Sequence, residues 1–342
     1  MNMNDRKLTI LKIIIDDFID TAQPVGSRTI AKKYPIGISS ATIRNEMADL
    51  EELGYLTQPH TSAGRIPSDL GYRLYVDALM ASEYLKKEQA ELVRGLLLNN
   101  LIEVKDVVTR AAKLLAELTG MTAIITLPQF KKSRLCNFKL VKLAGAKVLM
   151  IIVTDSGAFK AVPINFIDVE QSLLDNISII MTDRFTNKNI EDIDARSVNH
   201  LTIAYPEFKT VVEYLVPIIK DVFKEFDSLE HVVEGVNHLI DTPEFADGTK
   251  VKRMMSLLKD PKMIQGLVGN VEADGIFIKI GNEIGIAELS DCSVVTTAYK
   301  VNGKIAGKVA VLGPTRMGYG KVVSVADYIR ETLSEMFSGI NL

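Results

Sequence analysis

Residues 39–67 read SSATIRNEMADLEELGYLTQPHTSAGRIP, and this stretch decides the fold of the N-terminal part of the chain. Four of its apolar residues recur at helical spacing, namely Ile43, Met47, Leu50 and Leu53. A serine at either of the first two positions can cap that helix, and Gly54 stands where a left-handed residue ends one. Residues 55–58 and 65–67 then read as short strands around a turn-rich tip. The stretch therefore predicts a helix followed by a β-ribbon.

Two more helices are expected upstream of this stretch. Residues 6–22 carry an apolar stripe at spacings of three and four, made of Leu8, Leu11, Ile14, Ile15, Phe18 and Ile19. Pro24 and Gly26 end that helix, and a short second helix begins at Ser27. Three helices and a β-ribbon within about 65 residues follow the order of the winged helix-turn-helix, a relative of the helix-turn-helix that reads DNA.

The rest of the chain alternates between helical and strand-like patterns. Helical patterns are expected at 83–119, 168–188, 206–226 and 325–337, and strand patterns at 122–127, 135–143, 148–154, 159–166, 274–289 and 294–311. Pro217 is expected to interrupt its helix, and Asn302-Gly303 suggests a tight hairpin. The economical interpretation is one α+β domain from near residue 120 to the C-terminus, interrupted by a helix-rich insertion at 171–249. Three domains in series would give a similar pattern.

Composition limits the classes of protein that this chain can be. Hydrophobic residues make up 47 % and charged residues 24 %, as in soluble globular proteins, and no apolar run approaches the length of a bilayer span. The N-terminus does not resemble a signal peptide, and two cysteines fit a reducing cytoplasm. The net charge of −3 argues mildly against nucleic acid, although binding depends on where the charges lie.

No catalytic or metal-binding motif stands out. The sequence lacks the H-E-x-x-H, G-x-S-x-G and G-x-G-x-x-G patterns, and His231 and His238 have no third ligand at metal spacing. Residues 311–322 resemble a phosphate loop only in part, because Val322 replaces the hydroxyl residue that would hold magnesium. We interpret this segment as a glycine-rich turn leading to the last helix, and we expect neither a catalytic site nor a cofactor.

The third helix carries the candidate DNA-binding residues. At about 100° per residue, the face opposite its apolar stripe presents Ala41, Arg44, Asn45, Ala48 and Glu52. Arginine can bond guanine O6 and N7 together, and asparagine can do the same for adenine N6 and N7. Hydroxyl groups near the helix start can bond phosphate oxygens. The candidate DNA-binding residues are Ser27, Arg28, Ser39, Ser40, Thr42, Arg44, Asn45, His60 and Arg65.

Two features of the winged-helix pattern are also compatible with functions other than DNA binding. The third helix also carries four acids, Glu46, Asp49, Glu51 and Glu52, which would limit non-specific affinity for DNA. Winged helices also serve as protein–protein modules, in which case these residues would be ordinary solvated side chains. An enzyme or adaptor could use the module in this way, and a regulator could instead respond to a small metabolite.

Several long motifs resemble the heat-inducible transcription repressor family, HrcA. They are QPVGS at 23–27, SSATIRNEMADLE at 39–51, HTSAGRIP at 60–67, GYRLYVD at 71–77 and LGPTRM at 312–317. The motifs lie at both ends of the chain, and its length is compatible with the family. The resemblance is therefore nearly full-length, although residues 171–249 carry no motif that identifies them on their own.

The resemblance implies a dimeric, cytoplasmic repressor of chaperone operons that binds an inverted-repeat operator, the CIRCE element. It implies dependence on the GroE chaperonin for activity, and loss of activity on heat stress. It also implies an α+β multidomain fold with a GAF-like domain and an inserted dimerisation domain. On this basis we expect a winged-helix DNA-binding domain at 1–82, a helical connector at 83–119, the GAF-like domain at 120–170 and 250–342, and the inserted dimerisation domain at 171–249.

Overall fold

The computed structural model describes residues 5–60, 64–81, 87–98, 104–128, 134–154, 159–166, 170–186, 188, 203–227, 230–240, 242–245, 248–269 and 274–339. The chain divides into two compact units. The first unit comprises residues 1–127, 230–299 and 307–334, and the second comprises 128–229, 300–306 and 335–342. No helix in the described part of the chain is long and apolar enough to cross a membrane.

The N-terminal part of the first unit has the predicted order of three helices and a β-ribbon. Its elements are α1 (Asp5–Thr21), α2 (Ser27–Lys33), α3 (Ser40–Glu52), β1 (Leu56–Thr57) and β2 (Ile66–Pro67). Of the predicted stripe of α1, Leu11, Ile14 and Ile15 are buried in the core, whereas Leu8, Phe18 and Ile19 are only partly buried. The core also contains Ile10, Ile30, Ile43, Met47 and Leu50. Strands β1 and β2 pair antiparallel, and Val25 forms a bridge to Arg65 beside them. We call residues 5–67 the winged-helix module.

A short helix continues directly from this module. Helix α4 (Asp69–Leu74) is capped by Ser68, whose side chain accepts a hydrogen bond from the N–H of Gly71. It runs into a π-helical turn, Tyr75–Leu79, in which Tyr75 is buried. A cap at Ser68 or Asp69 predicts a helix that extends to Leu79, but the sequence pattern does not distinguish the π turn from α-helix.

A five-stranded sheet forms the body of the first unit, with the strand order β7-β3-β10-β9-β8. Its strands are β3 (Thr122–Thr126), β7 (His231–Glu234), β8 (Ile276–Ile280), β9 (Cys292–Val301) and β10 (Lys304–Pro314). β3 pairs antiparallel with both β7 and β10, and β8 pairs antiparallel with β9. The turn between β9 and β10 has positive φ at Asn302 (50°) and Gly303 (78°), which confirms the predicted tight hairpin.

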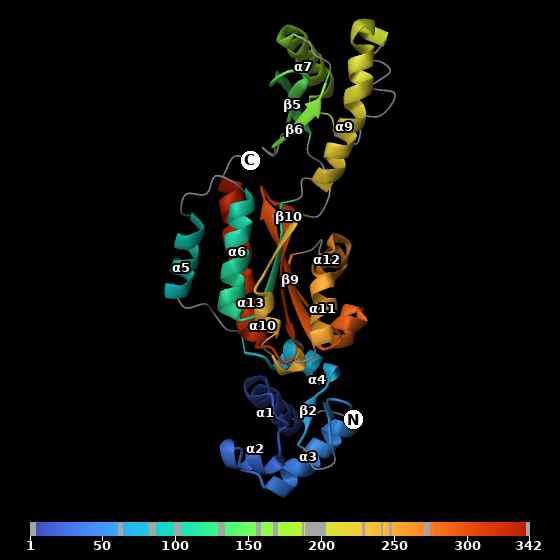
Figure 1. The fold of residues 1–342 in the computed structure, drawn as a ribbon. Helices are drawn as coiled ribbons and strands as arrows, with labels where there is room; N and C mark the ends of the chain where they lie inside the picture. Colours follow the sequence, from blue (N-terminus) through green and yellow to red (C-terminus); the bar gives the residue numbers. More distant parts are fainter. Residues whose placement is uncertain are drawn as a thin grey trace. The chain divides into compact units, whose positions relative to one another are not determined.

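Helices cover both faces of this sheet. Figure 1 shows α6 (Val104–Thr119) and α13 (Tyr319–Gly339) on one side, and α11 (Gly248–Leu257) and α12 (Pro261–Val268) on the other. The apolar stripe of α6 is buried within the chain, so it serves as intramolecular core. This part also contains α5 (Lys87–Leu98), α10 (Val236–Ile240) and a 3-10 turn at Pro243–Phe245.

Two expectations about the body are corrected. Residues 274–289 are strand only at Ile276–Ile280, and two 3-10 turns follow at Gly281–Ile284 and Ala287–Leu289. Gly281 (φ 53°) and Gly285 (φ 78°) adopt left-handed backbone conformations that end the extended chain. The last helix begins at Tyr319, six residues before the predicted start at 325.

The second unit is built on a separate three-stranded antiparallel sheet. Its elements are β4 (Leu135–Lys142), β5 (Lys147–Thr154), β6 (Phe159–Asn165), α7 (Gln171–Phe185), a 3-10 turn at Pro206–Phe208 and α9 (Lys209–Asp227). β5 is the central strand, and buried residues of the sheet, α7 and α9 share one core. Helix α9 runs through Pro217 without a break, so the expected interruption there is wrong.

This arrangement changes the predicted boundary of the insertion. We expected residues 120–170 to belong to the same body as 250–342, and the insertion to cover 171–249. In the described part of the chain β4, β5 and β6 form a sheet of their own, whereas residues 231–234 return to the five-stranded sheet as β7. The interrupting unit therefore covers residues 128–229. The strand pattern of 135–166 is correct, but a period-two pattern does not say which sheet a strand will join.

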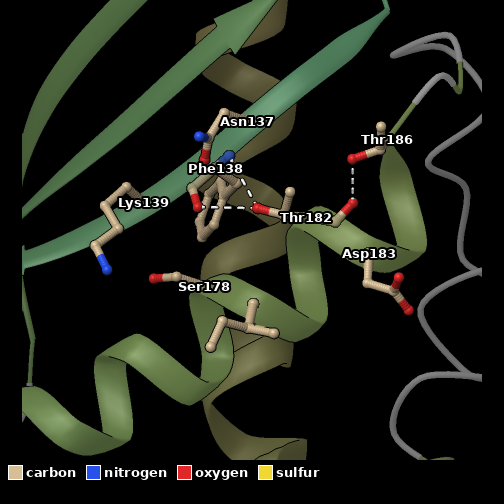
Figure 2. Close-up of a pocket in the computed structure, with 8 residues that line it drawn as sticks. Asn137, Phe138, Lys139, Ser178, Thr182, Asp183 and Thr186 are labelled. Atoms are coloured by element: carbon tan, nitrogen blue, oxygen red, sulfur yellow. Dashed lines mark hydrogen bonds between the residues drawn. The ribbon is translucent and has the colours of Figure 1, made fainter.

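Helix α7 closes the free edge of β4 in the second unit. Three N–H groups along this edge donate to side chains of α7: Phe138 to Thr182 Oγ1 (3.1 Å), Leu140 to Ser178 Oγ (2.9 Å) and Lys142 to Gln171 Oε1 (2.7 Å). The hydroxyl of Thr182 also donates to the carbonyl of Phe138, as Figure 2 shows. Polar side chains of α7 thus provide the edge of β4 with hydrogen-bond acceptors that a neighbouring strand would otherwise provide.

Candidate DNA-binding surface

Helix α3 is fixed by its cap and by its buried face. Ser39 is the N-cap, and its Oγ accepts from the N–H of Thr42 at 3.1 Å. Ile43, Met47 and Leu50 are buried against the rest of the winged-helix module. These three residues hold the rotation of the helix about its axis, because turning it would bring them into water.

The opposite face of α3 is open to solvent, as the sequence predicts. The exposed residues along it are Ala41, Arg44, Asn45, Ala48 and Glu52. Arg44 and Asn45 lie within the first turn and a half of the helix, flanked by the two small alanines. The side chains best suited to reading base edges are therefore on an accessible surface rather than in the protein's interior.

Three of the four acids on α3 are paired with cations of the same module. Lys7 Nζ lies 2.7 Å from Glu46 Oε2 and 2.8 Å from Asp49 Oδ2, and these hydrogen bonds, to Asp49 and then to Glu46, raise the pKa of Lys7. Arg65 Nη2 lies 2.7 Å from Glu51 Oε2. These pairs compensate negative charge that would otherwise repel a phosphate backbone.

The hydroxyl groups predicted to bind phosphate are brought together. Ser40 Oγ donates to Ser27 Oγ at 3.2 Å, so the starts of α2 and α3 lie side by side. The hydroxyl groups of Ser39 and Thr42 are 2.9 Å apart. The neighbouring side chain of Arg28 is exposed. Five of the predicted residues thus surround the N-terminal ends of two helices, where free N–H groups favour an anion.

The two predicted residues of the wing differ in their surroundings. His60 is exposed, and residues 61–63 of the predicted wing tip lie outside the described part of the chain. Arg65 is half-buried, and its Nε donates to Glu51 Oε2 at 2.8 Å while its backbone pairs with Val25. A Cβ at Gly64 would lie 2.4 Å from the backbone of Val25, so this close approach requires glycine. Arg65 therefore joins the wing base to α3 and does not stand free beside Arg44.

Sequence reasoning missed the residues that hold the three helices together. Asp17 is buried in α1 and accepts hydrogen bonds from Lys33 and from the hydroxyl of Tyr34, which anchors α2 to α1. Its hydrogen bond with Lys33 raises the pKa of that amine. A signal was available, because an acid within the apolar stripe of a helix needs a partner when it is buried. The identity of that partner could not be read from the sequence.

The second unit contains a groove that could be considered for a small ligand (Figure 2). It is lined by Asn137, Phe138, Lys139, Ser178, Ile179, Thr182, Asp183 and Thr186. The hydroxyls of Ser178, Thr182 and Thr186 already donate to backbone carbonyls. Among the residues that the structure describes, no three histidine, cysteine or acidic side chains gather as they would around a metal. These three hydroxyl groups of the groove serve the fold of the second unit.

Comparison with known proteins agrees with these features. Residues 105–323 match the family model described as the HrcA protein C-terminal domain. The heat-inducible transcription repressor HrcA of Clostridium perfringens strain 13 is 40 % identical over 336 residues, which cover 97 % of this chain and 98 % of that protein. The repressor of the same name from Symbiobacterium thermophilum is 40 % identical over 339 residues, covering 98 % of each chain.

One solved structure shares the fold along the whole chain. It is described as a hypothetical protein at 2.2 Å resolution, and it superposes with a TM-score of 0.64 at 24 % sequence identity, covering 99 % of both chains. The fold, the exposed face of α3 and the two full-length relatives agree with one another. This chain therefore belongs to the family of heat-inducible transcription repressors, HrcA, whose members regulate transcription and are not enzymes.

Proposed function

We propose that the chain represses heat-shock chaperone operons by binding as a dimer to an inverted-repeat operator, the CIRCE element. The observation that carries this proposal is the exposed face of α3: Arg44 and Asn45 are open to solvent, and cations of the module pair three of the four acids of the helix. A helix of this kind fits the major groove, where arginine selects guanine and asparagine selects adenine.

The surrounding residues divide into two roles. Ser27, Arg28, Ser39, Ser40 and Thr42 would bind phosphate at the N-terminal ends of α2 and α3, and His60 would contact the backbone from the wing. These contacts set the register of the module on the duplex without reading its sequence. For Arg65 we propose a supporting role, since its guanidinium already binds Glu51 and keeps the wing beside α3.

We place the dimer contact on the second unit. Large apolar side chains are exposed there, namely Phe159 (71 %), Ile179 (65 %), Ile203 (76 %) and Tyr214 (43 %). Exposed apolar surface of this kind favours association of two copies. A dimer would bind two half-sites at once, and the second contact is effectively intramolecular and therefore strengthens binding.

Heat would lower the amount of folded, active repressor. We propose that the GroE chaperonin keeps the chain in its active form and that unfolded clients occupy the chaperonin on stress. A chain of marginal stability responds strongly, because a change of about 1.4 kcal/mol shifts a population tenfold. The five-stranded domain would correspond to the GAF-like part of the family fold, with the second unit inserted in it.

A binding experiment tests the proposal directly. The parent chain should shift a CIRCE-type inverted repeat at concentrations that leave a scrambled duplex free, and chaperonin should increase the active fraction. Arg44→Ala should lose about 1–3 kcal/mol of discrimination at one base position. Arg253→Ala, an exposed arginine of α11, is the matched control and should bind as the parent does. Equal discrimination by Arg44→Ala and the parent would show that α3 does not read bases through Arg44.

A further inference from the structure

Helix α4 is firmly attached to the winged-helix module. The hydroxyl of Ser68 donates to the carbonyl of Gly54 (2.6 Å), and the N–H of Ser68 donates to the carbonyl of Tyr55 (3.1 Å). A Cβ at Gly71 would lie 2.2 Å from that same carbonyl oxygen of Tyr55, so the two segments are in direct contact. The hydroxyl of Tyr75 donates to Asp16 of α1 at 2.7 Å. Because Gly54 and Tyr55 lie just beyond the end of α3, these contacts join α4 to the recognition helix.

The same helix is held by the turn that follows β8 in the body of the first unit. Asp69 Oδ2 accepts hydrogen bonds from the backbone N–H (3.2 Å) and the side-chain amide (3.1 Å) of Asn282. Arg73 donates through Nε to Glu283 Oε1 (3.0 Å) and through Nη2 to the carbonyl of Ile278 (2.6 Å). A second contact joins Arg73 Nη2 to Glu283 Oε2, which makes the pair bidentate. We call Asp69, Arg73, Asn282 and Glu283 the α4 latch.

The turn is shaped for this contact. Gly281 has a φ of 53°, and a Cβ there would lie 2.3 Å from Asp69 Oδ2, so only glycine allows the carboxylate to come this close. Glu283 is fixed by accepting from the N–H of Ile280 at 2.9 Å. Burial alone would raise the pKa of Glu283, but the hydrogen bonds from Arg73 and Ile280 outweigh it and lower the pKa below its usual value. The Arg73–Glu283 pair of the latch is therefore an ion pair at neutral pH.

Contacts beside the latch support the same arrangement. Arg316, from the glycine-rich segment before α13, pairs with Glu244 and donates to the carbonyl of Ile19 of α1 at 3.4 Å. The ring of Tyr72 packs 6.1 Å from the ring of Tyr319. The Tyr72 hydroxyl is buried, and none of the described residues provides it with a hydrogen-bond partner. A buried hydroxyl without a partner costs stability, so the charged contacts around it are needed to hold α4 in this position.

We propose that the α4 latch consists of positioning residues for operator recognition, which set the spacer length between the half-sites that the repressor accepts. This inference rests on the proposed function, in which a dimer reads an inverted repeat. In such a dimer, the distance and the angle between the two recognition helices are set by the rest of the two chains. Changing the spacer by one base pair rotates one half-site by about 34° around the duplex relative to the other. A dimer with a rigid junction at α4 would therefore bind the altered operator weakly, whereas a dimer with a loose junction would still bind it.

The test compares spacer preference with half-site affinity in the full-length repressor. Inverted repeats with spacers one and two base pairs shorter or longer are compared with the preferred operator, beside a duplex that carries a single half-site. We expect the parent to lose at least about tenfold in affinity at a wrong spacer, and Arg73→Glu to lose less than about threefold. Half-site affinity should stay within about twofold, because α3 is unchanged.

Variants that restore or spare the latch make the test specific. The charge swap R73E/E283R should recover part of the spacer preference that Arg73→Glu loses, since the opposite charges face each other again although the bonds to Ile278 and Ile280 are lost. Asn282→Ala, a milder truncation of an exposed side chain, should relax the preference partly and provides a second variant should Arg73→Glu fail to fold. Arg253→Glu on α11 is the matched control and should keep the preference of the parent.

The outcomes separate this proposal from the proposed function. An inverted repeat that the parent binds no better than a scrambled duplex would overturn the proposed function itself. A parent that binds every spacer equally well, or latch variants that keep the preference of the parent, would overturn the positioning proposal while leaving operator binding intact.

Discussion

The winged-helix module and the second unit satisfy their polar groups in opposite ways. In the module, charged side chains of neighbouring helices pair with one another, as Lys7 does with Glu46 and Asp49. In the second unit, uncharged side chains of α7 bind the backbone of β4 at its free edge. A small helical module has no strand edge to protect at its centre, whereas a three-stranded sheet has one on each side. This difference indicates that the stability of the three-stranded sheet depends on a few side chains of α7 more than the stability of the module depends on any one ion pair.

Removing the helix side chains from the β4 edge should have the largest effect on stability. The double variant S178A/T182V leaves the N–H groups of Leu140 and Phe138 without acceptors, which should lower the free energy of unfolding by about 2–5 kcal/mol. Denaturant unfolding measures the loss, and hydrogen exchange should show faster exchange in the peptide that covers residues 135–142. The exposed pair S172A/T210V on α7 and α9 is the control and should change little. If the two double variants were equally stable, α7 would not be what protects this edge.

The same comparison explains what the sequence could predict. The caps, the apolar stripes and the outward face of α3 depend on residues within a few turns of one another, so local patterns were sufficient. Residues 135–166 are also strand-like locally, but their choice of sheet depends on partners far along the chain. For this reason the boundary at residue 171 stays a prediction, whereas the compact second unit of the structure includes the whole of residues 128–229.

The candidate site shows the same division between local and distant information. The exposure of Arg44 and Asn45 follows from helical periodicity, because both lie opposite a buried stripe. The pairing of Arg65 with Glu51 could not be predicted, since it depends on how the wing folds back on α3. Arg73 lies in a recognisable motif, but its partner Glu283 is 210 residues away in the chain. Contacts between residues so far apart in the sequence leave no periodic pattern from which they could be predicted.

Breaking the ion pairs of the module should have an intermediate effect. Glu46→Gln removes the charge of a buried acid while Lys7 keeps its contact with Asp49, so the loss should be about 1–3 kcal/mol of unfolding free energy. Glu52→Gln, at an exposed position of the same helix, is the control and should stay within about 0.5 kcal/mol of the parent. Thermal and denaturant unfolding measure both. A loss for Glu46→Gln as large as that of S178A/T182V would remove the contrast between the two regions.

The smallest effect is expected at the base of the wing, where stability and DNA contact can be separated. Arg65→Ala removes a partly exposed ion pair with Glu51, so the free energy of unfolding should fall by only about 0.5–1 kcal/mol. Its operator affinity should keep the salt dependence of the parent, because the guanidinium is committed to Glu51. Arg28→Ala should instead reduce the slope of log affinity against log salt by about 1, as the loss of one phosphate contact does. Titrations at several salt concentrations decide between the two roles. An equal reduction of the slope in both variants would mean that Arg65 exchanges Glu51 for phosphate on DNA, and the wing would then belong to the binding surface itself.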